Sequence, residues 1–180
     1  MQTFLPYNVY YSVGLLDRQR LQKQLVECQQ LVMVLTGKTT VYRNHPAAIM
    51  WEHNIGALIV YGRVCYDCYR YLCGGAHKSG EWLVNNDIAD VADPVPPDWL
   101  YDGRVSHSHR ANLARKGVAA FLAPSRSYEH RCANGRRNCI TMYDTIAPSN
   151  IYCWPKFDGN KWIYRQKMVD GPWLPGEYKV

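Results

Sequence analysis

The sequence predicts a mainly α-helical, compact single domain with about three main helices and loop-rich decoration. Apolar residues recur at steps of three and four between about Gly14 and Leu35, which is typical of one face of a helix. The stretch from Pro46 to Cys73 is apolar on most sides and ends at a glycine pair, which indicates a buried core helix. No strong strand pattern accompanies these helices, so the predicted class is mainly α.

The composition supports a folded chain that could accept a polyanion. Its 180 residues are enough for one domain with a sizeable core, and 47% hydrophobic against 20% charged residues exclude a disordered tail. The net charge of +6 fits a nucleic-acid ligand, although many proteins without one are as basic. The 14 Tyr and 6 Trp residues suit stacking on bases and suit core packing equally well.

The first predicted helix carries two different faces, and Gly37 is a plausible stop for it. One is an apolar stripe, and the other holds Arg20, Lys23 and Glu27, with Glu27 at the border between a basic surface and buried material. One interpretation is a solvated face with an internal ion pair, worth a few tenths of a kcal/mol. The other is a carboxylate close to a phosphate-binding surface, able to stabilise a positive sugar-like transition state or to move a proton.

Two more helices are expected further along the chain. Asn44 or His45 lies near the start of the second, with Pro46 in its first turn. Residues 74–103 are loop-rich, with one short helix near 81–84. The third helix covers about 105–116 and presents polar and basic side chains that suit either phosphate contacts or a solvated face. These side chains are His109, Arg110, Asn112, Arg115 and Lys116.

The remainder of the chain is predicted to be irregular. Residues 124–139 look like a basic insertion or flexible loop, and a small hairpin is expected near Gly159-Asn160. We divide the single domain 1–180 into a helical core (1–116), a divergent basic segment (117–151) and a C-terminal aromatic tail (152–180).

The seven cysteines favour reduced thiols over disulfides or zinc. Cys65 and Cys68 have zinc-like spacing, but they fall inside a predicted long helix, so we expect buried thiols, no metal and no cofactor. The N-terminus has no signal-peptide pattern, and the most apolar run is too short for a membrane span. Phosphate-loop, dinucleotide and nucleophile-elbow motifs are absent. We therefore expect an intracellular protein without a membrane partner.

Several segments together resemble the pyrimidine-dimer DNA glycosylase family, of the endonuclease V type of phage and bacteria. The matching segments are M-Q-T-F-L-P-Y at the N-terminus, L-D-x-x-R-L-x-K-Q-x-V-E at 16–27, N-H-P-A-x-x-M-W at 44–51, S-H-R-x-N-L-x-R-K at 108–116 and Y-x-W-P at 152–155. The resemblance covers about residues 1–116 and is thin from 117 to 151. No single motif is specific, but the set in this order is.

The resemblance implies a helical domain that binds double-stranded DNA and acts as a glycosylase with AP-lyase activity on damaged or modified pyrimidines. The N-terminal α-amine would attack the sugar C1′ to form a Schiff base, which places the nucleophile on Met1 and the assisting carboxylate on Glu27. DNA contacts are expected from the basic residues of the first helix, from the N-H-P motif and from the third helix. They are Arg18, Arg20, Lys23, Asn44, His45, His109, Arg110, Asn112, Arg115 and Lys116.

One departure from the family leaves two functions open. The best-characterised form exposes a threonine amine after Met1 is removed, whereas Gln2 here normally blocks that removal. Either the Met1 amine serves as the nucleophile, or the chain is a non-catalytic nucleic-acid-binding protein on the same scaffold, on its own or as part of a larger assembly. A protein partner is expected through 117–151 or the tail, and the expected location is the cytoplasm of a bacterial or phage-infected cell. A zinc-stabilised interaction protein is a third, weaker hypothesis.

Overall fold

The computed structural model describes residues 3, 5, 8–85, 94–116, 127–131, 137–141 and 149–177, with only the backbone of 127–131 and 137–141. The mainly α prediction is confirmed, but the expectation of about three helices is wrong, since the described residues form six α-helices and also β-strands. The helical elements are α1 (Val9–Gly14), α2 (Arg18–Leu35), α3 (Pro46–Trp51), α4 (Ile55–Cys73), α5 (Lys78–Asn85), the 3-10 helix η2 (Asp98–Tyr101) and α6 (Gly103–Arg115).

Helix α2 begins four residues later than the sequence predicts. The Asp17 carboxylate accepts the backbone N–H of Arg20 at 2.8 Å, which caps the helix and fixes its start at Arg18. The separate helix α1 precedes it, and it was not predicted from the sequence. The predicted stop is confirmed, because Gly37 follows the last turn with φ of 74°.

The predicted long helix 46–73 is two helices. Helix α3 ends at Trp51, whose carbonyl accepts the N–H of Asn54 at 2.9 Å in the turn that starts α4. The chain changes direction there because α3 packs against the sheet while α4 packs along α2. Gly74, with φ of 67°, ends α4 as expected.

The C-terminal part forms a three-stranded sheet, of which the sequence indicated only one small hairpin. Strands β3 (Ile151–Phe157), β4 (Trp162–Met168) and β5 (Trp173–Glu177) are antiparallel in that order, and the hairpin predicted near residue 159 joins β3 to β4. In the segment expected to be a loop, β1 (Ser127–Arg131) pairs with β2 (Arg137–Thr141). Helix α5 confirms the expected short helix, and α6 begins two residues before its predicted start, where Asp102 caps it.

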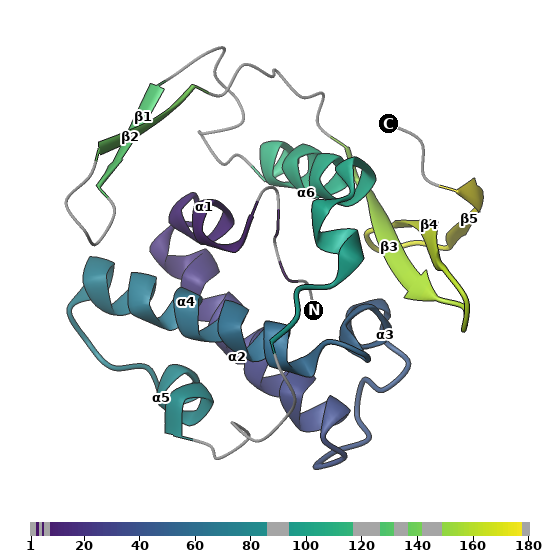
Figure 1. Cartoon of the computed structure of the whole chain (residues 1–180), viewed down its shortest axis with the longest axis horizontal. Helices are drawn as coiled ribbons and strands as arrows, with labels where there is room; N and C mark the ends of the chain where they lie inside the picture. Colours follow the sequence, from purple (N-terminus) through teal and green to yellow (C-terminus); the bar gives the residue numbers. More distant parts are fainter. Residues whose placement is uncertain are drawn as a thin grey trace.

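The core lies where α2 and α4 pack together, and α6 and the three-stranded sheet complete the fold on the other side (Figure 1). Its largest buried side chains include Trp51, Tyr61 and Trp99. Strand β3 packs on both α3 and α6, so the sheet is part of the same body as the helices. Among the described residues, no helix combines the length and the apolar character needed to cross a membrane.

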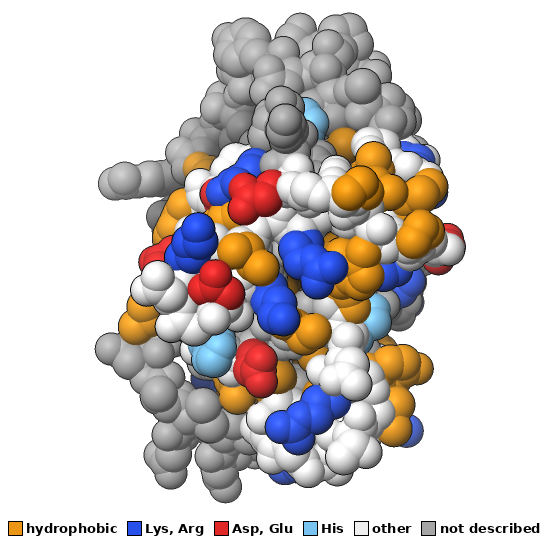
Figure 2. All heavy atoms as spheres, turned by 90° about the vertical axis from the view of Figure 1, so that its right-hand side faces the viewer, with side chains coloured by type: hydrophobic (Ala, Val, Ile, Leu, Met, Phe, Trp, Pro, Cys, Tyr) orange, Lys and Arg blue, Asp and Glu red, His pale blue; other side chains and the backbone are white. Residues whose placement is uncertain are grey.

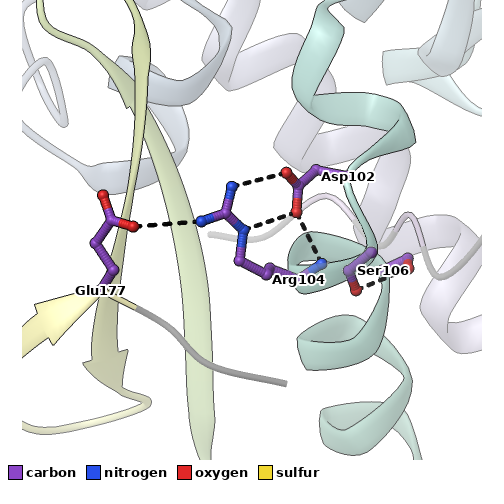
Figure 3. A network of polar contacts seen from close by, with 5 residues as sticks. Asp102, Arg104, Ser106 and Glu177 are labelled. Carbon is purple, nitrogen blue, oxygen red and sulfur yellow. Dashed lines mark hydrogen bonds and ion pairs between the residues drawn. The ribbon is translucent and has the colours of Figure 1, made fainter.

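Arg104 connects the start of α6 to the sheet (Figure 3). Its guanidinium lies 2.9 Å from an Asp102 carboxylate oxygen and 3.4 Å from a Glu177 carboxylate oxygen of β5. The same group stacks 3.6 Å from the centre of the Tyr164 ring on β4. Its hydrogen bond with Asp102 lowers the pKa of that carboxyl group, so the pair stays ionised over the physiological range.

Candidate functional site

A cleft of about 750 Å³ lies between α2, the start of α3, the end of α6 and the sheet. It joins residues that are more than 140 positions apart in the chain, because β3 and the turn after β4 form its wall opposite α2. The residues that line it are Gln19, Arg20, Lys23, Gln24, Glu27, His45, Pro46, Arg115, Lys116, Tyr152, Trp154, Lys167, Met168, Val169 and Asp170.

Glu27 is held in place on the α2 side of this cleft. Its side chain is 7% exposed, with one carboxylate oxygen 3.8 Å from the Lys23 ammonium and the other accepting the Gln24 amide N–H at 3.1 Å. The Tyr61 hydroxyl donates to the Gln24 carbonyl oxygen at 2.7 Å, so the amide cannot turn without losing a buried hydrogen bond. A nearly buried carboxylate is thus fixed in one orientation at the cleft.

The rest of the cleft is basic. Five Lys and Arg side chains face two carboxylates among its lining residues. Arg20 donates to the Lys116 carbonyl oxygen at 2.8 Å and also pairs with Asp17, which joins α2 to the end of α6. Burial, followed by the charges of Lys23, Arg115 and Arg20, lowers the pKa of Lys116. Such a concentration of cations favours binding of phosphate groups.

Lys and Arg side chains also occur outside the cleft. Figure 2 shows the face of the molecule that carries the three-stranded sheet, where they are interspersed with hydrophobic side chains and a few carboxylates. This mixture of positive charge and apolar surface suits contact with phosphates and with exposed bases.

His45 reaches the cleft as a neutral side chain. Its Nδ1 accepts the N–H of Ala47 at 3.1 Å and caps α3, which leaves Nε2 as the protonated nitrogen. Burial is the largest cause that lowers the pKa of His45 to about 4. At neutral pH this side chain therefore provides a hydrogen-bond donor and no charge.

A row of aromatic rings leads from the exposed Tyr42 to three side chains that line the cleft. Tyr42 lies edge-on to His45 with ring centres 6.4 Å apart, and His45 lies edge-on to Trp154 at 6.1 Å. Trp154 contacts Tyr152 at 5.6 Å, and both are buried in β3. Burial raises the pKa of the Tyr152 phenol, and the Glu27 carboxylate adds to this effect.

The N-terminal segment is anchored beside the cleft at two described positions. The Thr3 hydroxyl accepts the Trp51 indole N–H at 2.9 Å, and the N–H of Leu5 donates to Nδ1 of His109 at 3.0 Å. Trp51 stacks on Tyr61, the residue that orients Gln24 and through it Glu27.

The His109 anchor predicts acid sensitivity of the fold. Burial lowers the pKa of His109 from 6.5 to about 3, so below pH 6.5 the unfolded chain binds a proton that the folded chain does not. The stabilisation is complete above pH 6.5 and is lost as the pH falls towards 3. At pH 5 we expect a loss of roughly 2 kcal/mol of unfolding free energy relative to pH 7.

Urea unfolding of the wild type and of His109→Asn between pH 7 and 4 measures this effect. Asparagine keeps an acceptor for the Leu5 N–H and removes the titrating group. We expect the variant to show a shallower dependence of unfolding free energy on pH, and equal slopes would contradict the assignment to His109.

The cleft brings together six of the residues that the sequence nominates. They are Arg20, Lys23, Glu27, His45, Arg115 and Lys116. Arg18 and Asn44 are exposed and do not line it, and Arg110 is half-buried. His109 and Asn112, expected at the DNA surface, are fully buried; the Asn112 amide donates to the Ile151 carbonyl oxygen at 2.9 Å and joins α6 to β3. Met1 lies outside the described residues.

Several residues that line the cleft were not predicted from the sequence to be functional. Gln24 reads as a neutral position of a helix face, and Lys167 and Asp170 have no motif around them. Tyr152 and Trp154 belong to the Y-x-W-P match, so that motif was the signal that could have identified them.

The zinc hypothesis gains no support from the described part of the chain. There, no group of three or more His, Cys, Asp or Glu side chains is placed to hold a metal ion. Cys65 is a buried free thiol of α4, and burial raises its pKa, which disfavours the thiolate that zinc needs.

One comparison with known proteins gives a match in the N-terminal part of the chain. Residues 1–70 match the pyrimidine dimer DNA glycosylase family. The resemblance that the motifs indicate is confirmed over this range, which contains α2 with Glu27 and the His45 turn. The parts of the cleft from α6 and the sheet lie beyond the pyrimidine dimer DNA glycosylase match. No curated protein and no solved structure gives a significant match.

Proposed function

We propose that this protein is a DNA glycosylase with AP-lyase activity on damaged or modified pyrimidines in duplex DNA. The single observation that carries the proposal is a carboxylate fixed by hydrogen bonds inside a basic cleft, Glu27, on a helix within the matched glycosylase range. The cations around it suit the phosphates next to an extruded nucleotide.

The proposed chemistry uses the α-amine of Met1 as nucleophile. The neutral amine forms a bond to C1′ as the C1′–base bond breaks, and the base leaves with the bonding electrons and takes up a proton. Opening of the C1′–O4′ bond, with transfer of one proton from the nitrogen to O4′, gives the protonated Schiff base and a free O4′ hydroxyl. Removal of a C2′ proton then expels the 3′ phosphate by β-elimination, and water releases the enzyme. An α-amine suits this role because its pKa of about 7.7–8.0 leaves much of it neutral near pH 7.

Glu27 is proposed to act at two points of this sequence. Its negative charge offsets the positive charge that develops on the sugar as the base leaves, and it accepts the C2′ proton during elimination. The Lys23 ammonium lies 3.8 Å from the carboxylate, and the Gln24 amide fixes its direction. His45 and Tyr152 also line the cleft and provide hydrogen-bonding groups there.

Borohydride trapping tests the proposal directly. Sodium borohydride reduces a Schiff base to a stable amine, so incubation with a duplex that contains an abasic site is expected to give a covalent protein–DNA adduct. The adduct should form without added metal and should be absent with undamaged duplex. A protein that binds the abasic duplex but neither forms an adduct nor cleaves the strand would overturn the lyase proposal.

The second candidate is a non-catalytic nucleic-acid-binding protein on this scaffold, which Gln2 favours because it normally keeps Met1 in place. This candidate predicts binding that weakens steeply with salt, as neutralisation of phosphates by the cleft cations requires, without strand cleavage. The same abasic duplex serves for both measurements, so one set of experiments separates the two functions.

A further inference from the structure

We propose that Tyr42 is a stacking residue that inserts against the bases of duplex DNA and holds the target nucleotide outside the helix. This inference rests on the proposed function and adds to it the residue that stabilises the extruded state. The residue lies in the turn between α2 and α3, at the outer end of the aromatic row that leads into the cleft.

The backbone at Tyr42 is strained without a packing reason. Among the residues that the structure describes, Tyr42 is the one non-glycine residue with a positive φ, which is 71°. This conformation costs free energy for any residue that has a Cβ atom. The residue remains 55% exposed, so burial does not offset this cost. The turn is held by its own backbone, with the His45 N–H donating to the Tyr42 carbonyl oxygen at 2.9 Å. Strain kept at an exposed position indicates a functional constraint.

The surroundings of the turn match the chemistry of a base stack beside a phosphate backbone. Val41 is 59% exposed next to Tyr42, so the tip presents two adjacent apolar side chains, and Arg43 and Asn44 are exposed after them. Aromatic side chains bind unstacked bases with little sequence preference, while a neighbouring cation contacts phosphate.

The aromatic row connects this tip to the carboxylate. From Tyr42 the rings of His45, Trp154 and Tyr152 follow one another, and the last three line the cleft that contains Glu27. A nucleotide displaced by Tyr42 would therefore lie next to the rings that line the cleft containing Glu27. Extrusion of the nucleotide costs the free energy of unstacking its base. Stacking of the Tyr42 ring on the neighbouring bases, in the space that the nucleotide leaves, offsets this cost.

The experiment compares borohydride trapping on two substrates, an abasic site in duplex DNA and the same abasic site in a single strand. Only the duplex requires a nucleotide to be held outside the stack. We expect Tyr42→Ala to slow trapping about tenfold or more on the duplex, as loss of one base–aromatic stack does, and to leave the single-strand rate within about twofold. Tyr42→Phe keeps the ring and should behave as the wild type. Tyr71→Ala removes a tyrosine that is 79% exposed on α4, away from the cleft lining, and is the matched control.

A further variant separates function from folding. Tyr42→Gly removes the strain together with the ring, so its melting temperature is expected to equal or exceed that of the wild type while duplex trapping falls as in Tyr42→Ala. If the wild type forms the adduct, and Tyr42→Ala and Tyr42→Gly form it on the duplex at the wild-type rate, the stacking role of Tyr42 is wrong. The proposed function would stand in that case. Equal losses on both substrates would also overturn the stacking role. Absence of any wild-type adduct would instead overturn the proposed function.

Discussion

Glu27→Gln is expected to reduce strand cleavage by a factor of about 10² to 10⁴, the usual contribution of a positioned general acid or base. Glutamine has nearly the same shape and can still accept the Gln24 amide N–H through its carbonyl oxygen, so the Gln24–Tyr61 hydrogen bond should persist. The substitution removes the charge that would stabilise the sugar cation and the base that would accept the C2′ proton.

DNA binding by the same variant should be unchanged or tighter. Removing a carboxylate from among the cleft cations reduces repulsion of phosphate, so the expected result is a loss of turnover without a loss of affinity. Cleavage under single-turnover conditions and fluorescence anisotropy with an abasic duplex measure the two quantities. Glu81→Gln removes an exposed carboxylate that lines a different pocket and is the control. Turnover by Glu27→Gln within threefold of the wild type would exclude Glu27 from the mechanism.

The helices of this fold were predictable where one face is apolar and the other is not. Helix α2 has such a contrast, and its predicted stripe of Leu21, Leu25 and Cys28 is fully buried. The segment 46–73 is apolar on most sides, and a change of direction inside such a segment leaves no mark on its periodicity. For that reason α3 and α4 were predicted as one helix.

Apart from the hairpin near residue 159, the sheet was not predicted from the sequence, because its first strand is covered on both sides. Residues Tyr152 to Pro155 are buried in succession, since β3 packs between helices and neighbouring chain, and a strand of this kind lacks the alternation of apolar and polar residues. The aromatic wall of the cleft lies on this strand. Glu27 and four of the five cleft cations were therefore predicted from the sequence, whereas the position of Tyr152 and Trp154 in the cleft lining came from the structure.

On the polar face of α6, residues that were predicted to be exposed are buried. His109 and Asn112 look like surface residues because histidine and asparagine usually are exposed. Both are buried because each has a specific backbone partner, Leu5 for the first and Ile151 for the second. Those partners come from the two ends of the chain, and no local pattern on α6 could identify them. Only Arg115 and Lys116, at the end of the helix, reach the cleft.

Two amines compete for the role of nucleophile in the proposed reaction, and they give different expected results. One is the α-amine of Met1. The other is Lys116, which lines the cleft and whose pKa is lowered by burial and by the surrounding cations, as a nucleophilic lysine requires. If Met1 is the nucleophile, acetylation of the N-terminus should abolish borohydride trapping. Lys116→Arg should leave trapping within a few-fold of the wild type, because the α-amine starts the reaction and arginine keeps the positive charge.

Adding one glycine before Met1 makes the test sharper. The new α-amine retains its reactivity but moves by up to about 3.5 Å from its position relative to the Thr3 anchor, so trapping should fall while DNA affinity stays the same. Peptide mapping of the adduct should place the sugar remnant on the N-terminal peptide. A remnant on Lys116, or an adduct that survives acetylation of the N-terminus, would move the nucleophile from Met1 to the end of α6, where Lys116 would act opposite Glu27 across the same cleft.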